Sequence, residues 1–70
     1  MVTTCGERIR AARQRLGLTQ KALGRRVGVT QQNITQLESG EREPKAARLV
    51  ALARELGVSS DYLLGLQDAM

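Results

Sequence analysis

Four glycines, Gly17, Gly28, Gly40 and Gly57, divide this sequence into short segments. Before each glycine, apolar residues recur three or four positions apart, a pattern typical of an amphipathic helix that ends at a glycine. Helices of two or three turns are not stable alone in water, so the segments must pack around a shared core. The pattern predicts an all-α fold, a compact bundle of four to five helices that forms a single domain over residues 1–70, with a short C-terminal tail at 67–70.

Capping signals mark where these helices begin. Thr4 and Glu7 have the spacing of a capping box, and Pro44 suits the first position of a helix, where its missing N–H is not needed. The other N-cap candidates are Thr19, Thr30 and either Ser59 or Ser60. We therefore expect helices from residue 4 to 16, 20 to 27, 31 to about 38 and 44 to 56, and a short one after 59 or 60. The residues expected to face the core from the first four helices are Cys5, Ile9, Ala12, Leu16, Leu23, Val27, Ile34, Leu37, Leu49, Leu52, Ala53 and Leu56.

The charge balance favours a polyanionic partner. The chain has 11 Lys and Arg against 7 Asp and Glu, a net charge of +4, and such an excess attracts nucleic acid at long range. Nine of the 11 cations are arginine, which suits forked contacts with phosphates and bases, although arginine-rich composition also follows from GC-rich coding. The aromatic content is a single tyrosine, which leaves little for the base stacking of most single-strand and RNA readers. Duplex DNA is the better candidate.

Several other classes of protein lack support in the composition. The chain has no histidine and one cysteine, so the usual zinc-ligand and acid–base sets are missing. No phosphate-binding loop or pair of carboxylates in a plausible pocket indicates an enzyme. No apolar run is long enough to span a bilayer, and the first residues do not resemble a signal peptide. We therefore expect a cytoplasmic protein with no catalytic activity, no cofactor, no metal and no membrane partner.

Residues 20–39 contain the pattern that is most informative about function. Two helices, each barely two turns long, are joined by a few residues around Gly28, which suits a turn with positive φ. Gly24 allows a close crossing of the two helices, and Val29 can fill the core below the turn. With the apolar positions Leu23, Val27, Ile34 and Leu37, this arrangement is typical of a helix-turn-helix, a DNA-binding motif whose second helix enters the major groove.

With these residues in view, the chain resembles the Cro and phage-repressor family, also called the XRE-like helix-turn-helix family. The resemblance covers nearly all of residues 8–64. It rests on Arg10 and Arg13, Gly17 to Gln20, Leu23, Gly28 and Val29, Glu38 with Gly40, Pro44, Gly57 to Ser59, and Asp61 to Leu64. Residues 30–38 look especially like the recognition helix of a lambdoid phage repressor. The chain departs from the family at Gly24, where alanine is usual, and at Glu41 and Glu43, where cations are common.

Four polar residues of the second motif helix lie on adjoining faces that point away from the core, namely Gln31, Gln32, Thr35 and Gln36. The surface is uncharged, whereas purely electrostatic binding would favour a basic one. A glutamine side chain has both a donor and an acceptor and can pair in bidentate fashion with N7 and N6 of adenine. We therefore predict that these four residues contact base edges. The alternative interpretation is a solvated helix surface, on which glutamine is also common.

Phosphate contacts are expected at helix N-termini, where N–H groups are free and the helix dipole is positive. The resemblance implies such a contact at Gln20, supported by Thr19 just before it. Arg42 and Lys45 flank the start of the expected fourth helix, and we predict phosphate contacts there as well. Ordinary solvent exposure is the alternative interpretation of these two cations.

Two charged residues are expected to pair inside the fold. Arg13 lies one residue from the core stripe of the first helix and Glu38 lies at the end of the third, so an internal ion pair is plausible, and the resemblance implies it. Other arginines are assigned to solvated helix faces, namely Arg8, Arg15, Arg25, Arg26, Arg48 and Arg54. The role of Arg10 stays open.

The expected function is that of a transcriptional repressor that binds a specific double-stranded operator as a homodimer. The protein is expected in the bacterial cytoplasm, associated with the nucleoid, and encoded by the bacterium or by a phage. The dimer interface is assigned to Val58, Tyr62 and Leu66, because the C-terminal segment has more apolar surface than so small a core needs. An antitoxin or a restriction-modification controller would use the same motif. A protein-interaction module with its leucine-rich surface at residues 58–66 is the alternative from another class.

Overall fold

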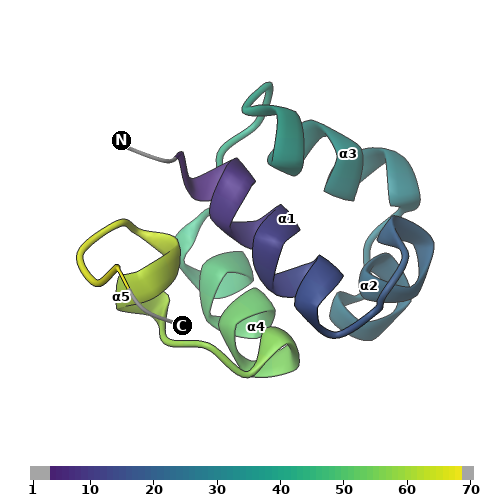
Figure 1. Cartoon of the computed structure of the whole chain (residues 1–70). Coiled ribbons are helices and arrows are strands. Elements are labelled where there is room, and N and C mark those ends of the chain that lie inside the picture. Colours follow the sequence, from purple (N-terminus) through teal and green to yellow (C-terminus); the bar gives the residue numbers. More distant parts are fainter. Residues whose placement is uncertain (1–3, 69–70) are drawn as a thin grey trace.

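The computed structural model describes residues 4–68, and within this range it contains helices and no strand. The elements are α1 (Cys5–Arg15), α2 (Gln20–Val27), α3 (Gln31–Ser39), α4 (Ala46–Leu56) and α5 (Ser60–Leu63). α1 crosses the middle of the bundle, with α3 and α4 on either side of it, α2 at one end and α5 at the other (Figure 1). The predicted all-α bundle is confirmed. The last two residues of the predicted tail, 69–70, lie outside the described residues.

The predicted N-caps form as side-chain hydrogen bonds. Thr19 Oγ1 accepts from the backbone N–H of Ala22, and Thr30 Oγ1 accepts from that of Asn33. The capping box of Thr4 and Glu7 is complete, and of the two serine candidates Ser59 is the cap of α5. Since these bonds satisfy N–H groups that have no partner inside the helix, the sequence determines locally where four of the five described helices begin.

The start of α4 differs from the prediction. Pro44 does not occupy the first helical position, because α4 begins at Ala46 and its N-cap is Lys45, which makes no side-chain capping bond. The backbone of Lys45 is still extended, with φ −73° and ψ 165°. The N–H of Arg42 donates to the carbonyl of Gln36 at 3.1 Å, so the chain first turns back along α3. Two further residues are then needed before the helix can start, and Pro44 lies in this connection.

Leu16 is also misassigned by the sequence pattern. It was expected to extend the buried stripe of α1, but α1 ends at Arg15 and Leu16 is 44% exposed. The chain reverses at Gly17, which has φ 70°. There the N–H of Gly17 donates to the carbonyl of Gln14 and that of Leu18 to the carbonyl of Arg13, a Schellman ending. Because the chain reverses here, no helix within residues 4–68 packs over Leu16, the last residue of the apolar stripe.

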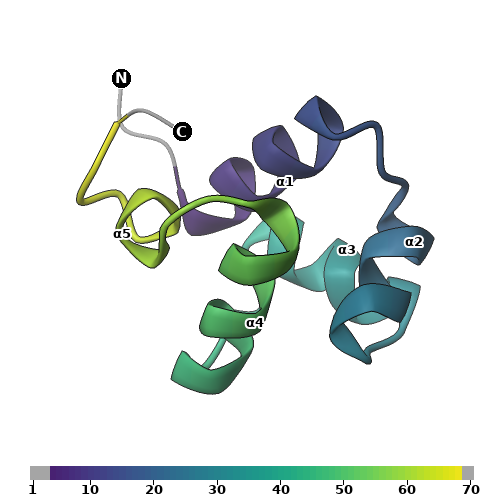
Figure 2. The same ribbon diagram turned by 90° about the horizontal axis from the view of Figure 1, so that it is seen from below.

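The core lies where α1, α3, α4 and α5 meet, and α2 contributes one large side chain to it. α3 packs against both α1 and α2, as both views of the bundle show (Figure 2). Complete burial of one such aliphatic side chain contributes about 1.5 to 3 kcal/mol, so a few of them dominate the stability of a domain of this size. The largest fully buried side chains are Ile9, Leu23, Ile34, Leu52, Leu56 and Leu63.

Two glycines hold elements close together. A Cβ at Gly24 would lie 2.7 Å from the carbonyl oxygen of Val29, so this glycine lets α2 approach the turn that follows it. A Cβ at Gly6 would lie 2.4 Å from the carbonyl oxygen of Leu37, which brings the first turn of α1 against the end of α3. The sequence pattern indicated the first contact but gave no sign of the second. Both approaches help fix the orientation of α3.

Arg8 is not on a solvated face, so that prediction is wrong. Its side chain is 10% exposed, and its guanidinium carbon lies 4.8 Å from the centre of the Tyr62 ring. The guanidinium donates to the carbonyl of Tyr62 at 3.2 Å, the carbonyl of Gln67 at 2.8 Å and the carboxylate of Asp68 at 3.4 Å. The cause is tertiary: α5 folds back beside the N-terminal half of α1 (Figures 1 and 2). The periodicity of α1 cannot reveal this neighbour.

Two further arginines bind the C-terminal ends of other helices. Arg48 is half-buried, contrary to the prediction, and donates to the carbonyl of Val27, the last residue of α2, at 2.7 Å. Arg15 is exposed as predicted, but it donates to the carbonyl of Leu56, the last residue of α4, at 3.2 Å. A cation at the C-terminal end of a helix is favourable because of the helix dipole. The remaining assigned arginines, Arg25, Arg26 and Arg54, are exposed as predicted. Arg10, whose role the sequence left open, is exposed too.

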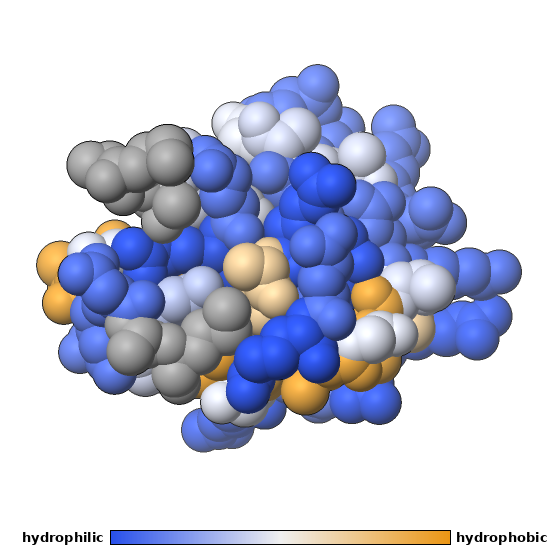
Figure 3. All heavy atoms as spheres, in the orientation of Figure 1, coloured by the Kyte–Doolittle hydropathy of each residue, from blue (hydrophilic) through white to orange (hydrophobic). Residues whose placement is uncertain are grey.

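The surface over α1 and α3 is mostly hydrophilic, and hydrophobic atoms gather towards the edges near α4 and α5 (Figure 3). The large exposed hydrophobic residues are Leu16, Val50, Leu64 and Leu66. Within residues 4–68, no helix has the length and apolar character needed to cross a membrane.

Candidate nucleic-acid interface

The outer side of α3 presents the residues predicted to read bases. Gln31, Gln32 and Thr35 are exposed, and Gln36 is half-buried. The opposite side of the same helix is anchored in the core by Ile34 and Leu37, together with Glu38. The orientation of the helix is therefore fixed by burial, and four uncharged polar residues are left on its outer side. Amide and hydroxyl groups can recognise base edges but add no net charge of their own.

The N-termini of α2 and α3 have no acidic residue in their first turns. Thr19 Oγ1 and Thr30 Oγ1 act as the acceptors of the capping bonds, so each hydroxyl keeps its own proton for another partner. The first-turn N–H groups and the positive end of each helix dipole favour an anion. The predicted phosphate contacts at Thr19 and Gln20 thus lie at a helix end whose electrostatics suit phosphate.

A hydrogen-bonded chain connects the inside of the fold with the outer side of α3. Arg13 pairs with Glu38 through two bonds, Nε to Oε2 at 2.6 Å and Nη2 to Oε1 at 3.0 Å, and the two side chains are 11% and 4% exposed. Gln20 Nε2 donates to Glu38 Oε1 at 3.1 Å. Thr35 Oγ1 lies 2.8 Å from Gln20 Oε1. The predicted phosphate contact at Gln20 and the predicted base contact at Thr35 are therefore joined to each other and to the internal ion pair.

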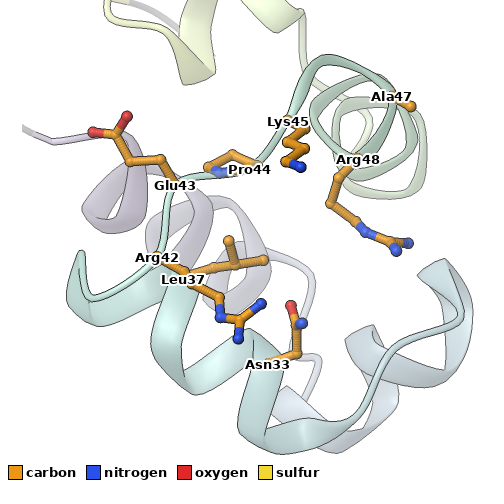
Figure 4. A pocket seen from close by; sticks show the side chains of 8 residues that line it. All are labelled: Asn33, Leu37, Arg42, Glu43, Pro44, Lys45, Ala47 and Arg48. Carbon is orange, nitrogen blue, oxygen red and sulfur yellow. The ribbon is translucent and has the colours of Figure 1, made fainter.

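A groove between α3 and the start of α4 carries the predicted cationic contacts. Arg42, Glu43 and Lys45 line it, and Arg42 points along α3 towards Asn33, while the carboxylate of Glu43 points away from Arg42 (Figure 4). Asn33 and Arg48 also face this groove (Figure 4). Sequence analysis missed both, and the i, i+3 relation of Asn33 to Gln36 was a signal that could have found the first. The groove is therefore lined by three cations, Arg42, Lys45 and Arg48, and by one carboxylate, Glu43.

The residues predicted for a dimer interface differ in their exposure. Leu66 is 76% exposed, and Val58 is partly buried against the core. Tyr62 is only 5% exposed, because its ring packs under Arg8 within its own chain. Leu64, which the prediction left out, is 54% exposed. The apolar surface near α5 that is open to a partner thus consists mainly of Leu64 and Leu66.

Cys5 is half-buried near the start of α1. Burial raises the pKa of its thiol, and the negative charge of Glu43 raises it further. Both effects favour the protonated thiol, which is a weak nucleophile and a poor metal ligand. Within residues 4–68, no group of three or more His, Cys, Asp and Glu side chains could hold a metal ion.

Comparison with known proteins gives consistent matches over most of the chain. The family model described as "Helix-turn-helix" matches residues 9–63. The repressor protein C2 of Salmonella phage P22 is 51% identical over 59 residues, which make up 84% of this chain and 27% of the repressor. The chain spans between 27% and 55% of the length of the first curated relatives it matches.

Two solved structures of the P22 c2 repressor have the same fold. One is the solution structure of its DNA-binding domain, with a TM-score of 0.88 and 43% identity, covering 100% of this chain and 95% of that one. The other is a crystal structure in complex with a synthetic operator, with a TM-score of 0.85 and 48% identity, covering 89% of this chain and 94% of that one. Sequence and fold agree, and the chain belongs to the helix-turn-helix family, as its likeness to phage repressors indicated.

Proposed function

We propose that this chain binds a specific operator in double-stranded DNA through α3 and acts as a transcriptional repressor. The observation that carries the proposal is the uncharged outer side of α3, with phosphate-binding features on both of its flanks. The P22 c2 repressor, which is 48% identical in sequence to this chain, has the same fold in its complex with a synthetic operator. The proposed activity is binding without catalysis, in the cytoplasm of a bacterium, on nucleoid or phage DNA.

Base reading is assigned to Gln31, Gln32, Thr35 and Gln36. The exposure of the first three residues supports this assignment, and Gln36 is half-buried on the same helix. An α-helix fits the major groove, where each base pair has a distinct set of donors and acceptors. Short amide and hydroxyl side chains on one helix side can reach only a few adjacent base pairs, so one copy reads half of an operator.

Phosphate binding is assigned to two places on either side of the reading helix. Thr19 and Gln20 lie at the N-terminus of α2, and Arg42 and Lys45 line the groove between α3 and α4. Contacts of this kind position the helix and give no sequence preference by themselves. Their separation on the two flanks of α3 suits the two phosphate backbones that border one major groove.

Two copies are proposed to bind one operator, with their recognition helices about 34 Å apart, the spacing of one turn of DNA. The interface is assigned to Val58 and Leu66, and the exposure of Leu64 adds it to the set. Tyr62 contributes by fixing α5 from within its own chain. Antitoxins and restriction-modification controllers share the motif, and the similarity to a phage repressor favours the repressor.

The test is a selection of bound duplexes from a random library, followed by a salt titration of the selected and of a scrambled duplex. We expect enrichment of a sequence with two-fold symmetry and an affinity for it at least about 10³-fold above that for the scrambled duplex. Equal binding of all duplexes would contradict sequence-specific recognition. Absence of binding at low salt would contradict the proposal entirely and favour the protein-interaction module.

A further inference from the structure

Thr35 differs from the neighbouring glutamines because its only hydroxyl proton is engaged inside the chain. Its Oγ1 lies 2.8 Å from Gln20 Oε1 and 3.1 Å from the carbonyl oxygen of Gln31. Both partners are acceptors, and a hydroxyl group has one proton to donate. While Gln20 Oε1, the nearer acceptor, holds that proton, Thr35 has only lone pairs and its methyl group left for a ligand on the outer side of α3.

The polarity of this contact is set from inside the fold. The carboxylate of Glu38 is bonded twice by Arg13 and is an acceptor only. The atom of Gln20 that lies 3.1 Å from Glu38 must therefore be the amide nitrogen, which places the amide oxygen towards Thr35. Gln20 keeps one amide proton, and Thr35 must donate rather than accept. The carboxylate of Glu38 thus sets the direction of the two bonds that lead through Gln20 to Thr35.

We propose that Thr35 recognises its base as a hydrogen-bond acceptor only, through the exocyclic amine of adenine or cytosine, and that Gln20 enforces this polarity. The inference rests on the proposed function. In the major groove the amines of adenine and cytosine donate, whereas N7 and O6 of guanine and O4 of thymine accept. A free threonine hydroxyl can serve either kind of base. With its proton engaged, Thr35 disfavours an acceptor at the same place, because two oxygens would face each other unpaired.

The geometry also couples base reading to phosphate binding. Gln20, Thr35 and Glu38 line one surface depression between α1, α2 and α3. The remaining amide proton of Gln20 serves a phosphate while its oxygen holds the hydroxyl of Thr35. A change at Gln20 therefore alters the sequence preference at the base pair that faces Thr35, although Gln20 itself does not touch that pair.

The experiment uses the whole chain and begins with the operator selected by the wild type. Thr35→Val keeps the shape of the side chain and removes its oxygen. The base pair at which this variant and the wild type differ in sequence preference is then the pair that faces Thr35. In that pair, adenine is replaced by purine, or cytosine by 2-pyrimidinone, each of which lacks only the exocyclic amine. We expect the wild-type affinity to fall about 2- to 10-fold, as for loss of one hydrogen bond, and the affinity of Thr35→Val to stay unchanged.

Two further variants test the polarity and the coupling. Thr35→Ser keeps the hydroxyl and should remain sensitive to loss of the amine, while Gln20→Leu should relax the preference at the same base pair. Ser39→Ala is the matched control, because Ser39 lines the same depression but its hydroxyl donates to the carbonyl of Gln36; its preference should equal that of the wild type. A thermal melt of each variant confirms that it is folded.

Three results would overturn the inference. These are a wild-type affinity that does not respond to loss of the amine, a loss of affinity in the wild type alone when a 7-deazapurine removes the N7 acceptor from that pair, or an unchanged preference in Gln20→Leu. If the wild type enriches no sequence at all, the proposed function fails instead, so the two failures are distinguishable.

Discussion

The inner and outer sides of α3 have different chemistry although they belong to the same nine residues. The inner side contains Ile34 and Leu37, and Glu38 is bonded there to Arg13. The outer side contains exposed Gln31 and Gln32 with no formal charge. The charged side chain of the helix is thus bonded inside the fold, and the outer side has no formal charge. The ionic contacts of this helix fix its position, and its neutral side chains are the ones proposed to select bases.

The largest effect should follow from breaking the inner side. We predict that Arg13→Met or Glu38→Met alone lowers the free energy of unfolding by about 3 to 5 kcal/mol, because each leaves a buried charge without its partner. The double variant should lose less than the sum of the two single losses. Urea denaturation of the four proteins measures this coupling. Additive losses would show that the pair contributes no interaction energy, despite Nε–Oε2 and Nη2–Oε1 distances of 2.6 and 3.0 Å.

The contacts between helices show what sequence can and cannot predict. Helix periods, threonine caps and positive-φ glycines are local signals, and they placed most helix ends within a residue or two. The hydrogen bonds of Arg8 and Arg48 could not be predicted, because each arginine donates to a carbonyl that is distant in the sequence. Arg8 donates to the carbonyl of Tyr62, and Arg48 donates to that of Val27. The close approach at Gly6 was hidden for the same reason.

The candidate site was predictable to a similar degree. Helical geometry alone placed Gln31, Gln32 and Thr35 on the exposed side of α3, since Ile34 and Leu37 had to face the core. The bond between Gln20 and Thr35 was not predictable, because it depends on how α2 is placed against α3. Sequence therefore indicates which side of a helix faces outward, and packing between helices decides which side-chain protons remain free.

A smaller effect is expected on the outer side. We predict that Gln31→Ala, Gln32→Ala or Gln36→Ala lowers the affinity for the selected operator by about 1 to 3 kcal/mol per half-site, the value of a bidentate base contact. The thermal stability should change little, because alanine is a good helix former and no core contact is removed. The measurement is the ratio of affinities for the operator and for a scrambled duplex of equal length.

The matched control for these substitutions is Gln14→Ala, an exposed glutamine at the end of α1. Its affinity ratio should equal that of the wild type. If all three α3 variants also leave the ratio unchanged, α3 is not the reading helix, and the distinction between its two sides has no functional meaning.

The smallest effect at a fixed salt concentration should come from the groove between α3 and α4, and it should differ in kind. Arg42→Ala or Lys45→Ala removes a cation from the lining of this groove, where each is predicted to neutralise a phosphate. Affinity should fall to the same extent for the operator and the scrambled duplex, because a phosphate contact gives no sequence information. The slope of log affinity against log salt should decrease by about 0.9 for each phosphate that a chain no longer neutralises.

Arg54→Ala, an exposed arginine at the opposite end of α4, should leave the slope almost unchanged. Gln20→Ala should weaken both duplexes with little change in slope, since a neutral amide releases no counterion, and it should also relax the preference at the base pair that faces Thr35. A change in the affinity ratio for Arg42→Ala or Lys45→Ala would mean that the groove also reads sequence, so that the coupling of phosphate binding to base recognition would not be confined to Gln20.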